Sequence, residues 1–410
     1  MHYNNLKDYL QSQKEWLKSF LFDILSIPSE SGKEEKIQQS LYDIFKDFAV
    51  SCELIEIQNN IVKDPEYSDT VKYLDYIGRP NLKVENHETG SKTIVINTHV
   101  DVVPPSAGQR NPYSPYMDEK GNIFARGACD AKGQIAAMAL VLKAASDYIK
   151  LNQKIICHLV IEEEIGGNGT LAMIRHGKNT KVDAVINMEP TNLRIMPSIR
   201  GAVWFNIYFF GESGHAGRTL NSTNPVYKAM HVIKILKEYH SKLEDKSKNY
   251  ALFKGIDNPM PLTIGQFISG KWPSMTPGGA TVRGVLGFLP NKTREEVIQG
   301  FINELDKPKN AWVKEGMNLR FDYRHNAVEL PISHWLVRKM SEACLRCEAE
   351  YSPIAMTAST DAVFYHEMGI PVLAFGPGNI KYAHSAIEHI NLNHIIKSAE
   401  IIISFINGLD

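Results

Sequence analysis

Histidine and acidic residues stand directly after apolar segments of this sequence, where they could bind a metal ion. His99 lies two residues before Asp101. A histidine can bind a metal through one ring nitrogen and donate its other N–H to such a carboxylate, which fixes the tautomer of the ring. Glu189 and His384 offer a further oxygen and a further nitrogen ligand. The sequence therefore contains the donor atoms of a metal centre.

Asp130 lies in a glycine-flanked loop, residues 127–133, immediately before a predicted helix. From such a loop one carboxylate can reach two ions and bridge them. A plain helix N-cap is the alternative interpretation of an aspartate at this position. Two histidines and three carboxylates, one of them bridging, suit two divalent ions, most readily zinc, with cobalt or manganese as alternatives.

Three consecutive glutamates, Glu162, Glu163 and Glu164, end an apolar segment and run into a glycine-rich turn. Successive residues of an extended chain point to opposite sides, so neighbouring glutamates could do different jobs. One could bind a metal while its neighbour accepts a proton from water that the metal has made more acidic. A solvated charge run is the alternative interpretation, but the position after a buried segment favours function.

The strands that precede these residues must position them. Apolar segments predict strands at 93–97, 154–161, 184–187 and 370–375. Gly376 and Gly378 follow the last of these in a turn that we expect to contact the substrate. Ligands of open α/β sheets bind outside the carboxyl ends of the strands, so we expect the candidate residues to converge on one site.

The order of elements predicts two domains. Helical spacing of apolar residues predicts helices at 16–27, 36–48, 133–148, 170–175, 225–239, 294–305, 335–349 and 392–406. Ser31 and Glu34 have the spacing of a capping box before the second helix. Strands and helices alternate up to residue 189, which is α/β order, whereas residues 200–326 follow the order of a separate α+β domain. We expect one domain of residues 1–199 and 327–410, with residues 200–326 inserted into it as a second domain.

Composition narrows the classes of function. Hydrophobic residues make up 43% and charged residues 22% of the 410 residues, which is typical of a soluble globular protein. Lys plus Arg number 45 and Asp plus Glu 46, so the net charge of -1 gives no reason to expect nucleic acid or a membrane as a partner. Small molecules or short peptides remain as substrates.

The cellular compartment is predicted to be the cytoplasm. No segment approaches the roughly 20 apolar residues of a membrane span, and the first residues lack an apolar stretch of secretory length. The five cysteines are odd in number and scattered, which suits a reducing compartment. Cys344 and Cys347 form a C-x-x-C motif inside a predicted helix, where we interpret them as structural.

Taken together, these segments resemble the zinc-dependent amidohydrolase and metallopeptidase family that includes acetylornithine deacetylase, succinyl-diaminopimelate desuccinylase, aminoacylase and glutamate carboxypeptidase. The matching motifs cover nearly the whole chain in order. They are His-x-Asp at 99–101, Gly-x-x-Asp-x-Lys-Gly at 127–133, the glutamate pair at 163–164, Glu-Pro-Thr at 189–191, Gly-x-x-x-His at 211–215, and Gly-Pro-Gly followed by Ala-His at 376–384.

The resemblance implies a role for each residue. One metal ion would take His99 and Glu189, and the other Glu164 and His384, with Asp130 bridging them. Glu163 would be the general base and Asp101 the partner of His99.

The resemblance also implies that residues 1–199 and 327–410 form the catalytic, metal-binding domain. The inserted residues 200–326 would form a lid that pairs two chains into a homodimer. His215 would reach the neighbouring subunit's site and stabilise the tetrahedral oxyanion. Ser274 stands where many relatives have a substrate-contacting Asn, and Gly287 where they have an Arg. Glu162 replaces an Asp of many members and keeps its charge. Substrate contacts in the lid are therefore expected to differ from those of relatives.

Deacylases of this family tend to carry Glu at the terminal metal-ligand position, and peptidases Asp. Glu189 therefore favours hydrolysis of an N-acyl amino acid, with a carboxypeptidase or dipeptidase as the alternative. A catalytically silent metal-binding or ligand-binding relative is a third hypothesis. Glu163 argues against it, because a silent descendant has no need of the base.

Overall fold

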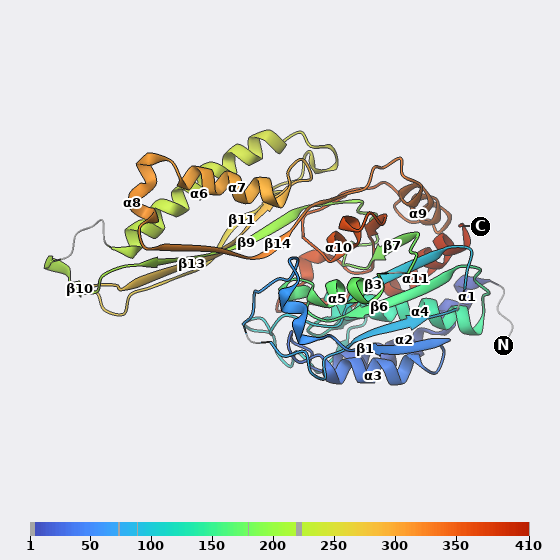
Figure 1. The fold of residues 1–410 in the computed structure, drawn as a ribbon. Coiled ribbons are helices and arrows are strands. Elements are labelled where there is room, and N and C mark those ends of the chain that lie inside the picture. The colour runs from blue at the N-terminus through green and yellow to red at the C-terminus, as the bar shows by residue number, and fades with distance from the viewer. Residues whose placement is uncertain (1–4, 73, 88, 179, 219–223, 410) are drawn as a thin grey trace.

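The protein folds into two units that differ in architecture (Figure 1). The structure is a computed structural model, and it describes residues 5–72, 74–87, 89–178, 180–218 and 224–409. The first unit is a helix-covered sheet built from both ends of the chain. The second unit, residues 201–325, extends away from it and has its own sheet.

The sheet of the first unit has six strands in the order β1-β2-β6-β3-β7-β17. Its strands are β1 Ser51–Ile55, β2 Asn81–Glu85, β3 Thr93–His99, β6 Lys154–Val160, β7 Ala184–Asn187 and β17 Val372–Ala374. The first two strands pair antiparallel, and β6, β3, β7 and β17 are parallel. The predicted α/β class is confirmed, with a mixed sheet.

Both faces of this sheet are buried around the central strands β3, β6 and β7, which explains why these strands are so apolar. Ile94 and Ile96 of β3 pack into a large core on one face, while Val95 packs into a second core on the other. The large core is covered by α1 Leu6–Ser12, α2 Lys14–Leu25, α3 Glu35–Phe45, α4 Gly133–Asp147, α9 Trp335–Arg346 and α11 Leu392–Asn407, and the second by α5 Asn168–His176 and α10 Ala362–Glu367.

Two small sheets flank the main one. They are β4 Tyr116–Met117, β5 Asn122–Phe124 and β18 His389–Asn391, and β8 Ser198–Ile199, β15 Val328–Glu329 and β16 Ala355–Met356.

The second unit is an antiparallel sheet covered on one face by helices. Its strands, in the order β11-β13-β9-β14, are β11 Leu262–Ser269, β13 Gly279–Phe288, β9 Gly201–Phe210 and β14 Met317–His325. The helices are α6 Pro225–Ser247, α7 Arg294–Leu305 and α8 Ala311–Lys314, and they share a separate hydrophobic core with the sheet. A short ribbon of β10 Gly214–His215 and β12 Met275–Thr276 lies at the far tip (Figure 1). The assignment of residues 200–326 as a separate domain stays a prediction.

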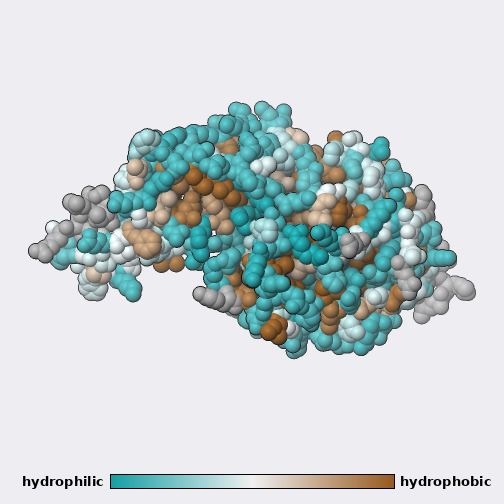
Figure 2. Space-filling view, viewed as in Figure 1, coloured by the Kyte–Doolittle hydropathy of each residue, from teal (hydrophilic) through white to brown (hydrophobic). Residues whose placement is uncertain are grey.

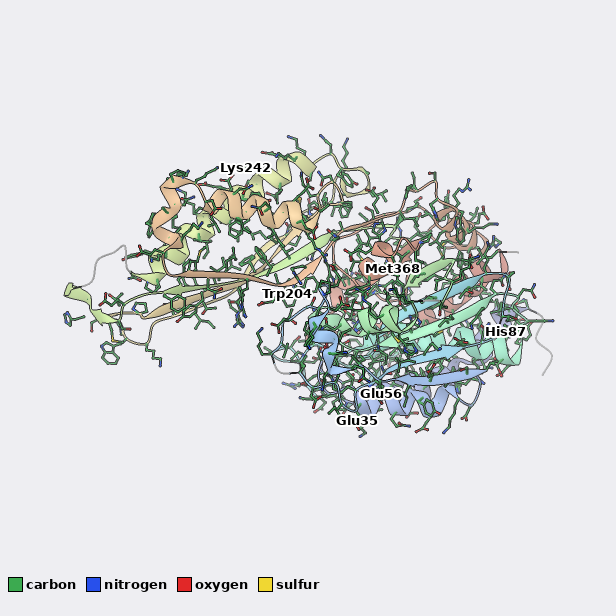
Figure 3. All side chains as sticks on the ribbon, viewed as in Figure 1. Glu35, Glu56, His87, Trp204, Lys242 and Met368 are labelled. Carbon is green, nitrogen blue, oxygen red and sulfur yellow. The ribbon has the colours of Figure 1, made fainter. Side chains whose placement is uncertain are left out.

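Apolar side chains remain exposed on the second unit. Residues of β9 alternate between the core and the opposite face, where Trp204, Tyr208 and Phe210 are exposed. The space-filling view also shows hydrophobic patches among hydrophilic residues on the face in view (Figure 2). Trp204 lies where the second unit meets the first (Figure 3).

Three local expectations differ from the structure. The capping box is wrong, because Ser31 donates its hydroxyl to Asp101 and no side chain caps α3. The N-cap interpretation of Asp130 is also wrong, because Lys132 occupies the N-cap of α4. The helix expected to end at residue 239 continues to Ser247, because His240 and Leu243 extend its buried face.

Among the described residues, no helix is long and apolar enough to cross a membrane.

Candidate metal centre

The candidate residues converge at the carboxyl ends of the parallel strands. His99 is the last residue of β3, Glu189 follows β7 by two residues, and Glu163 and Glu164 lie in a turn after β6. His384 comes from the segment between β17 and β18. The sheet thus brings together residues from distant parts of the chain, as the strand order requires.

Five of these side chains form two groups that share Asp130. His99, Asp130 and Glu189 form one group, and Asp130, Glu164 and His384 the other; within each group, potential ligand atoms lie within 4.8 Å of one another. His99 Nε2 is 3.0 Å from Asp130 Oδ1, whereas His384 Nε2 is 3.4 Å from Asp130 Oδ2. Each oxygen of Asp130 therefore faces a different group, which is the arrangement that a bridging ligand needs.

The electrostatics of these groups fit cations. Burial, and next the negative charge of Glu189, raise the pKa of Glu163 well above its usual value. Burial and the charge of Asp130 raise the pKa of Glu164, and a hydrogen bond to Glu164 raises the pKa of His384 to about 9. Buried carboxylates this close repel one another unless positive charge lies between them. The donor set of imidazole and carboxylate groups suits divalent ions of the zinc type.

Asp101 connects His99 to the glutamate turn. His99 Nδ1 lies 2.9 Å from the backbone oxygen of Asp101 and 3.4 Å from its carboxylate. The carboxylate accepts the backbone N–H groups of Glu163 at 3.1 Å and Glu164 at 3.2 Å. Asp101 thus positions both the histidine and the two glutamates.

The prediction that the neighbouring glutamates lie in extended chain and point to opposite sides is wrong. Glu163 and Glu164 lie in a 3-10 turn, Glu163–Ile165, and not in extended chain. Glu162 has a left-handed backbone with φ of 64° and sends its side chain away from the metal groups. Its carboxylate accepts hydrogen bonds from the Arg79 guanidinium at 2.6 Å and from the Tyr76 hydroxyl at 2.8 Å. Sequence reasoning missed Arg79 and Tyr76, because no local pattern connects them to residue 162.

The loop that carries Asp130 is held by Glu388, which sequence reasoning also missed. Glu388 accepts the backbone N–H groups of Gly127, Cys129 and Asp130, each at 3.1 Å, and pairs with Arg126. Burial raises the pKa of Glu388 to about 7. Glu388, near the end of the chain, therefore sets the position of Asp130, the proposed bridging ligand.

The glycines predicted to contact substrate lie beside the centre. A Cβ on Gly376 would come within 2.6 Å of the backbone oxygen of Glu189. A Cβ on Gly378 would come within 2.9 Å of Cys129 Sγ, and this glycine has φ of +81°. Both positions need glycine because the Glu189 and Asp130 loops approach so closely.

Two predicted site residues lie far from the centre of their own chain. His215 is exposed in β10, at the tip of the second unit (Figure 1). Ser274 is exposed beside it and accepts the N–H of Ala216 through its backbone oxygen. The structure of one chain does not bring either residue to the metal groups.

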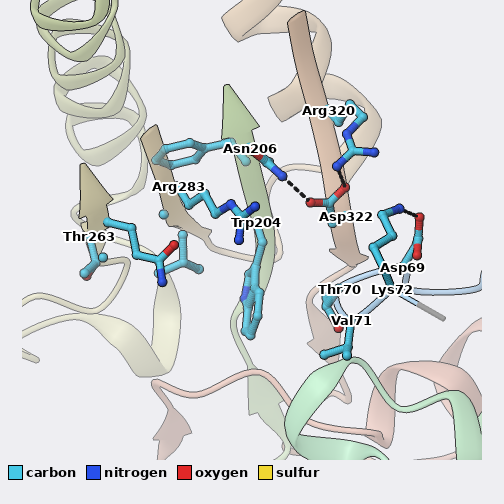
Figure 4. Close-up of a pocket in the computed structure, with 15 residues that line it drawn as sticks. Asp69, Thr70, Val71, Lys72, Trp204, Asn206, Thr263, Arg283, Arg320 and Asp322 are labelled. Atoms are coloured by element: carbon cyan, nitrogen blue, oxygen red, sulfur yellow. Dashed lines mark hydrogen bonds and ion pairs between the residues drawn. The ribbon is translucent and has the colours of Figure 1, made fainter. Parts of the chain in front are cut away.

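A separate cavity of about 550 Å³ lies between the second sheet and residues 69–72 (Figure 4). Trp204 and an ion pair of Arg320 with Asp322 line it. Tyr323 stacks on Trp204 with ring centroids 5.1 Å apart. Burial and then the charge of Glu163 raise the pKa of Tyr323.

The chain is similar to known proteins over most of its length. The profile of Peptidase family M20/M25/M40 matches residues 95–408. N-formyl-4-amino-5-aminomethyl-2-methylpyrimidine deformylase of Bacillus subtilis is 25% identical over 81% of this chain and 83% of its own length. Acetylornithine deacetylase of Myxococcus xanthus is 24% identical over 81% of this chain and 85% of its own length.

A solved structure shows the same fold. It is a dinuclear metal-binding peptidase of the M20 family from Bacillus subtilis, with a TM-score of 0.64 and 14% identity, and the match covers 98% of this chain and 97% of that one.

Proposed function

The chain belongs to peptidase family M20/M25/M40, whose members hydrolyse amide bonds, and we propose that it removes the acyl group of an N-acyl amino acid. The observation that carries the proposal is the pair of ligand groups sharing Asp130, with Glu163 beside them. The deformylase and the deacetylase among its relatives support a deacylase, as does a glutamate at position 189.

We assign five residues to two divalent ions. His99 and Glu189 would hold one ion, and Glu164 and His384 would hold the other. Asp130 would bind both ions. Zinc fits this donor set best, and cobalt or manganese also fit. When bound, such ions polarise an amide carbonyl and make a water more acidic.

Glu163 is assigned as the general base. It belongs to neither ligand group among the described residues, and Asp101 fixes its backbone. Its carboxylate would take a proton from the attacking water and pass it to the nitrogen of the leaving amine. Proton transfer by a positioned group of this kind typically contributes about 10²–10⁴ in rate.

We also propose that residues 200–326 form a lid through which two chains pair. This proposal is supported by the exposed position of His215 at the far tip, since an exposed histidine there can serve a neighbouring chain and not its own. Gly376 and Gly378 are proposed to contact the substrate of their own chain. Ser274, which lies beside His215, is proposed to contact the substrate of the neighbouring chain. The five free cysteines support a reducing compartment such as the cytoplasm.

Mixing two inactive variants tests the role of His215. His215→Ala chains and Glu163→Ala chains, exchanged into mixed dimers, would create one site with an intact base and a borrowed histidine. Activity well above both parents is expected. If subunits exchange and no activity returns, His215 does not act across the dimer.

A hydrolysis panel tests the substrate class. Acetyl, succinyl and formyl amino acids should be offered beside dipeptides, with zinc or cobalt added and Glu163→Gln as the control for contaminating activity. Hydrolysis of acyl amino acids alone supports the proposal. Hydrolysis of dipeptides alone would favour the peptidase alternative, for which the peptidase of the same fold is the supporting observation. A metal-loaded protein that cleaves neither class would favour the silent relative.

A further inference from the structure

A line of hydrogen bonds crosses the interior of the first unit and ends on Glu189. His158 Nδ1 lies 2.8 Å from the hydroxyl of Tyr365, which donates to Asn97 Oδ1 at 3.0 Å. Asn97 Nδ2 donates to Asn187 Oδ1 at 2.9 Å. Asn187 Nδ2 then donates to Glu189 Oε1 at 3.2 Å.

Sheet register explains how these polar groups meet inside an apolar sheet. Asn97 of β3 is the pairing partner of His158 on β6 and of Asn187 on β7. The three residues therefore form one row across neighbouring strands. Val95, Ile156 and Val185, each two residues earlier on those strands, pack in the core that α10 covers. The row points to the same face, because side chains repeat every second residue, and Tyr365 of α10 lies over it.

Every hydrogen bond in this row points toward the carboxylate. The Tyr365 hydroxyl has one hydrogen and gives it to Asn97, so it must accept the N–H of His158 Nδ1. Burial lowers the pKa of His158 to about 3, so the ring is neutral and has one N–H to donate. Aligned donors polarise one another, which strengthens the last bond of the series. The only charged acceptor in the series is Glu189.

Burial makes this arrangement hard to rearrange. Asn97 and Asn187 are each 1% exposed, and Tyr365 is 2% exposed. A buried amide that loses its partner incurs a desolvation penalty, so each side chain of the row is confined to the orientation that satisfies its neighbours.

We propose that Tyr365, Asn97 and Asn187 are positioning residues that orient the carboxylate of Glu189 for the ion shared with His99 and Asp130. This assignment rests on the proposed function, because it requires Glu189 to be a metal ligand. Residues behind a metal ligand typically change metal affinity by about 10–100-fold when they are replaced. Glu164 and His384, which would hold the second ion, make no hydrogen bond to the row among the described contacts.

Titration with cobalt tests the proposal. Metal-free wild-type protein should bind Co²⁺ in two steps that visible absorption can follow. The step that His384→Ala leaves unchanged belongs to the group of His99, Asp130 and Glu189. Tyr365→Phe keeps the ring and removes only the hydroxyl, and we expect it to weaken that step about 10-fold while leaving the other within two-fold. Asn187→Ala removes the donor to Glu189 itself and should weaken the same step further. Excess Co²⁺ should restore the turnover of Tyr365→Phe.

Tyr239→Phe is the matched control. Tyr239 is also buried and donates its hydroxyl to the backbone oxygen of Val297 at 2.9 Å, but it lies in the second unit. Its replacement should leave both cobalt steps unchanged.

Two results would overturn the assignment. In Tyr365→Phe, cobalt constants within two-fold of wild type at both steps would show that the row does not position Glu189. An equal weakening of both steps would show a general structural effect. A wild-type protein that binds one ion only would instead refute the proposed two-ion centre, and the assignment would fall with it.

Discussion

Arg79 supports the turn that carries the proposed base, and its removal gives the most demanding test of the structure. Its guanidinium donates to Glu34 at 2.8 and 3.0 Å and to Glu162 at 2.6 Å. Both carboxylate side chains are 0% exposed, and that of Arg79 is 7% exposed. One cation therefore pairs with two carboxyl groups that have no access to water, and burial raises the pKa of Glu34 to about 7.

Arg79→Met should lower the free energy of unfolding by about 3–5 kcal/mol, which is the usual cost of leaving a buried charge without its partner. The lower part of this range is expected, because Glu34, whose pKa burial raises to about 7, can take up a proton once the cation is gone. Glu162 also keeps the hydrogen bonds from Tyr76 and Asn168. The measurement is urea unfolding of the metal-free protein, followed by circular dichroism and tryptophan fluorescence, whose transitions should coincide for the comparison to hold.

Two controls make the result specific. The triple variant Arg79→Met, Glu34→Gln, Glu162→Gln should recover most of the lost stability, since it contains no unpaired buried charge. Lys46→Ala removes a surface partner of Asp43, whose pair is about half exposed on both sides, and should leave the stability nearly unchanged. A loss below 1 kcal/mol in Arg79→Met, or a triple variant no more stable than the single one, would contradict the reasoning.

Three further predictions follow from the site. Glu163→Gln should lower turnover by at least about 10²-fold with both metal ions retained, which combined turnover and metal analysis would check; loss of metal would disprove the assignment as base. Wild-type protein should bind two divalent ions, and His384→Ala should weaken one while the group of His99 stays occupied, as titration would show. Burial lowers the pKa of His325 to about 3 from 6.5, so between these values only the unfolded chain binds this proton. The free energy of unfolding should fall by up to about 1.4 kcal/mol per pH unit as the pH drops through that window, and urea unfolding at pH 5 and 7 should show a smaller fall for His325→Gln.

The proposed ligands other than His384 could be found from the sequence because each stands beside an apolar segment. His99 ends β3 and Glu189 follows β7, so the pattern that predicts the strands also places these residues at one edge of the sheet. Motif spacing then separates Asp130 from an ordinary helix cap. The resemblance supplied the pairing of ligands, which no local pattern contains.

The residues that hold the ligands could not be found in this way. Glu388 and Tyr365 contact residues more than 200 positions away, and nothing in their neighbourhood marks them. Ser31 shows that a distant partner can also overrule a local pattern. Its spacing to Glu34 predicts a local capping box, but its hydroxyl donates a hydrogen bond to Asp101, 70 residues away. Local hydrogen-bond rules fail where a distant charged acceptor offers a stronger bond.

Separate buried networks thus act on separate parts of the proposed centre. Arg79 holds Glu162 and with it the turn of the base, Glu388 holds the loop of Asp130, and Tyr365 acts through two asparagines on Glu189. Carboxylates crowded at one sheet edge repel one another, so without such supports they would move apart and lose the geometry that two ions require. These networks share no hydrogen bond among the described contacts, but Asp130 and Glu189 belong to the same ligand group, and neighbouring sites of this kind are coupled. Variants of Tyr365 should therefore impair the step of the His99 group, whereas variants of Glu388 should impair both steps of metal binding, because Asp130 would serve both ions.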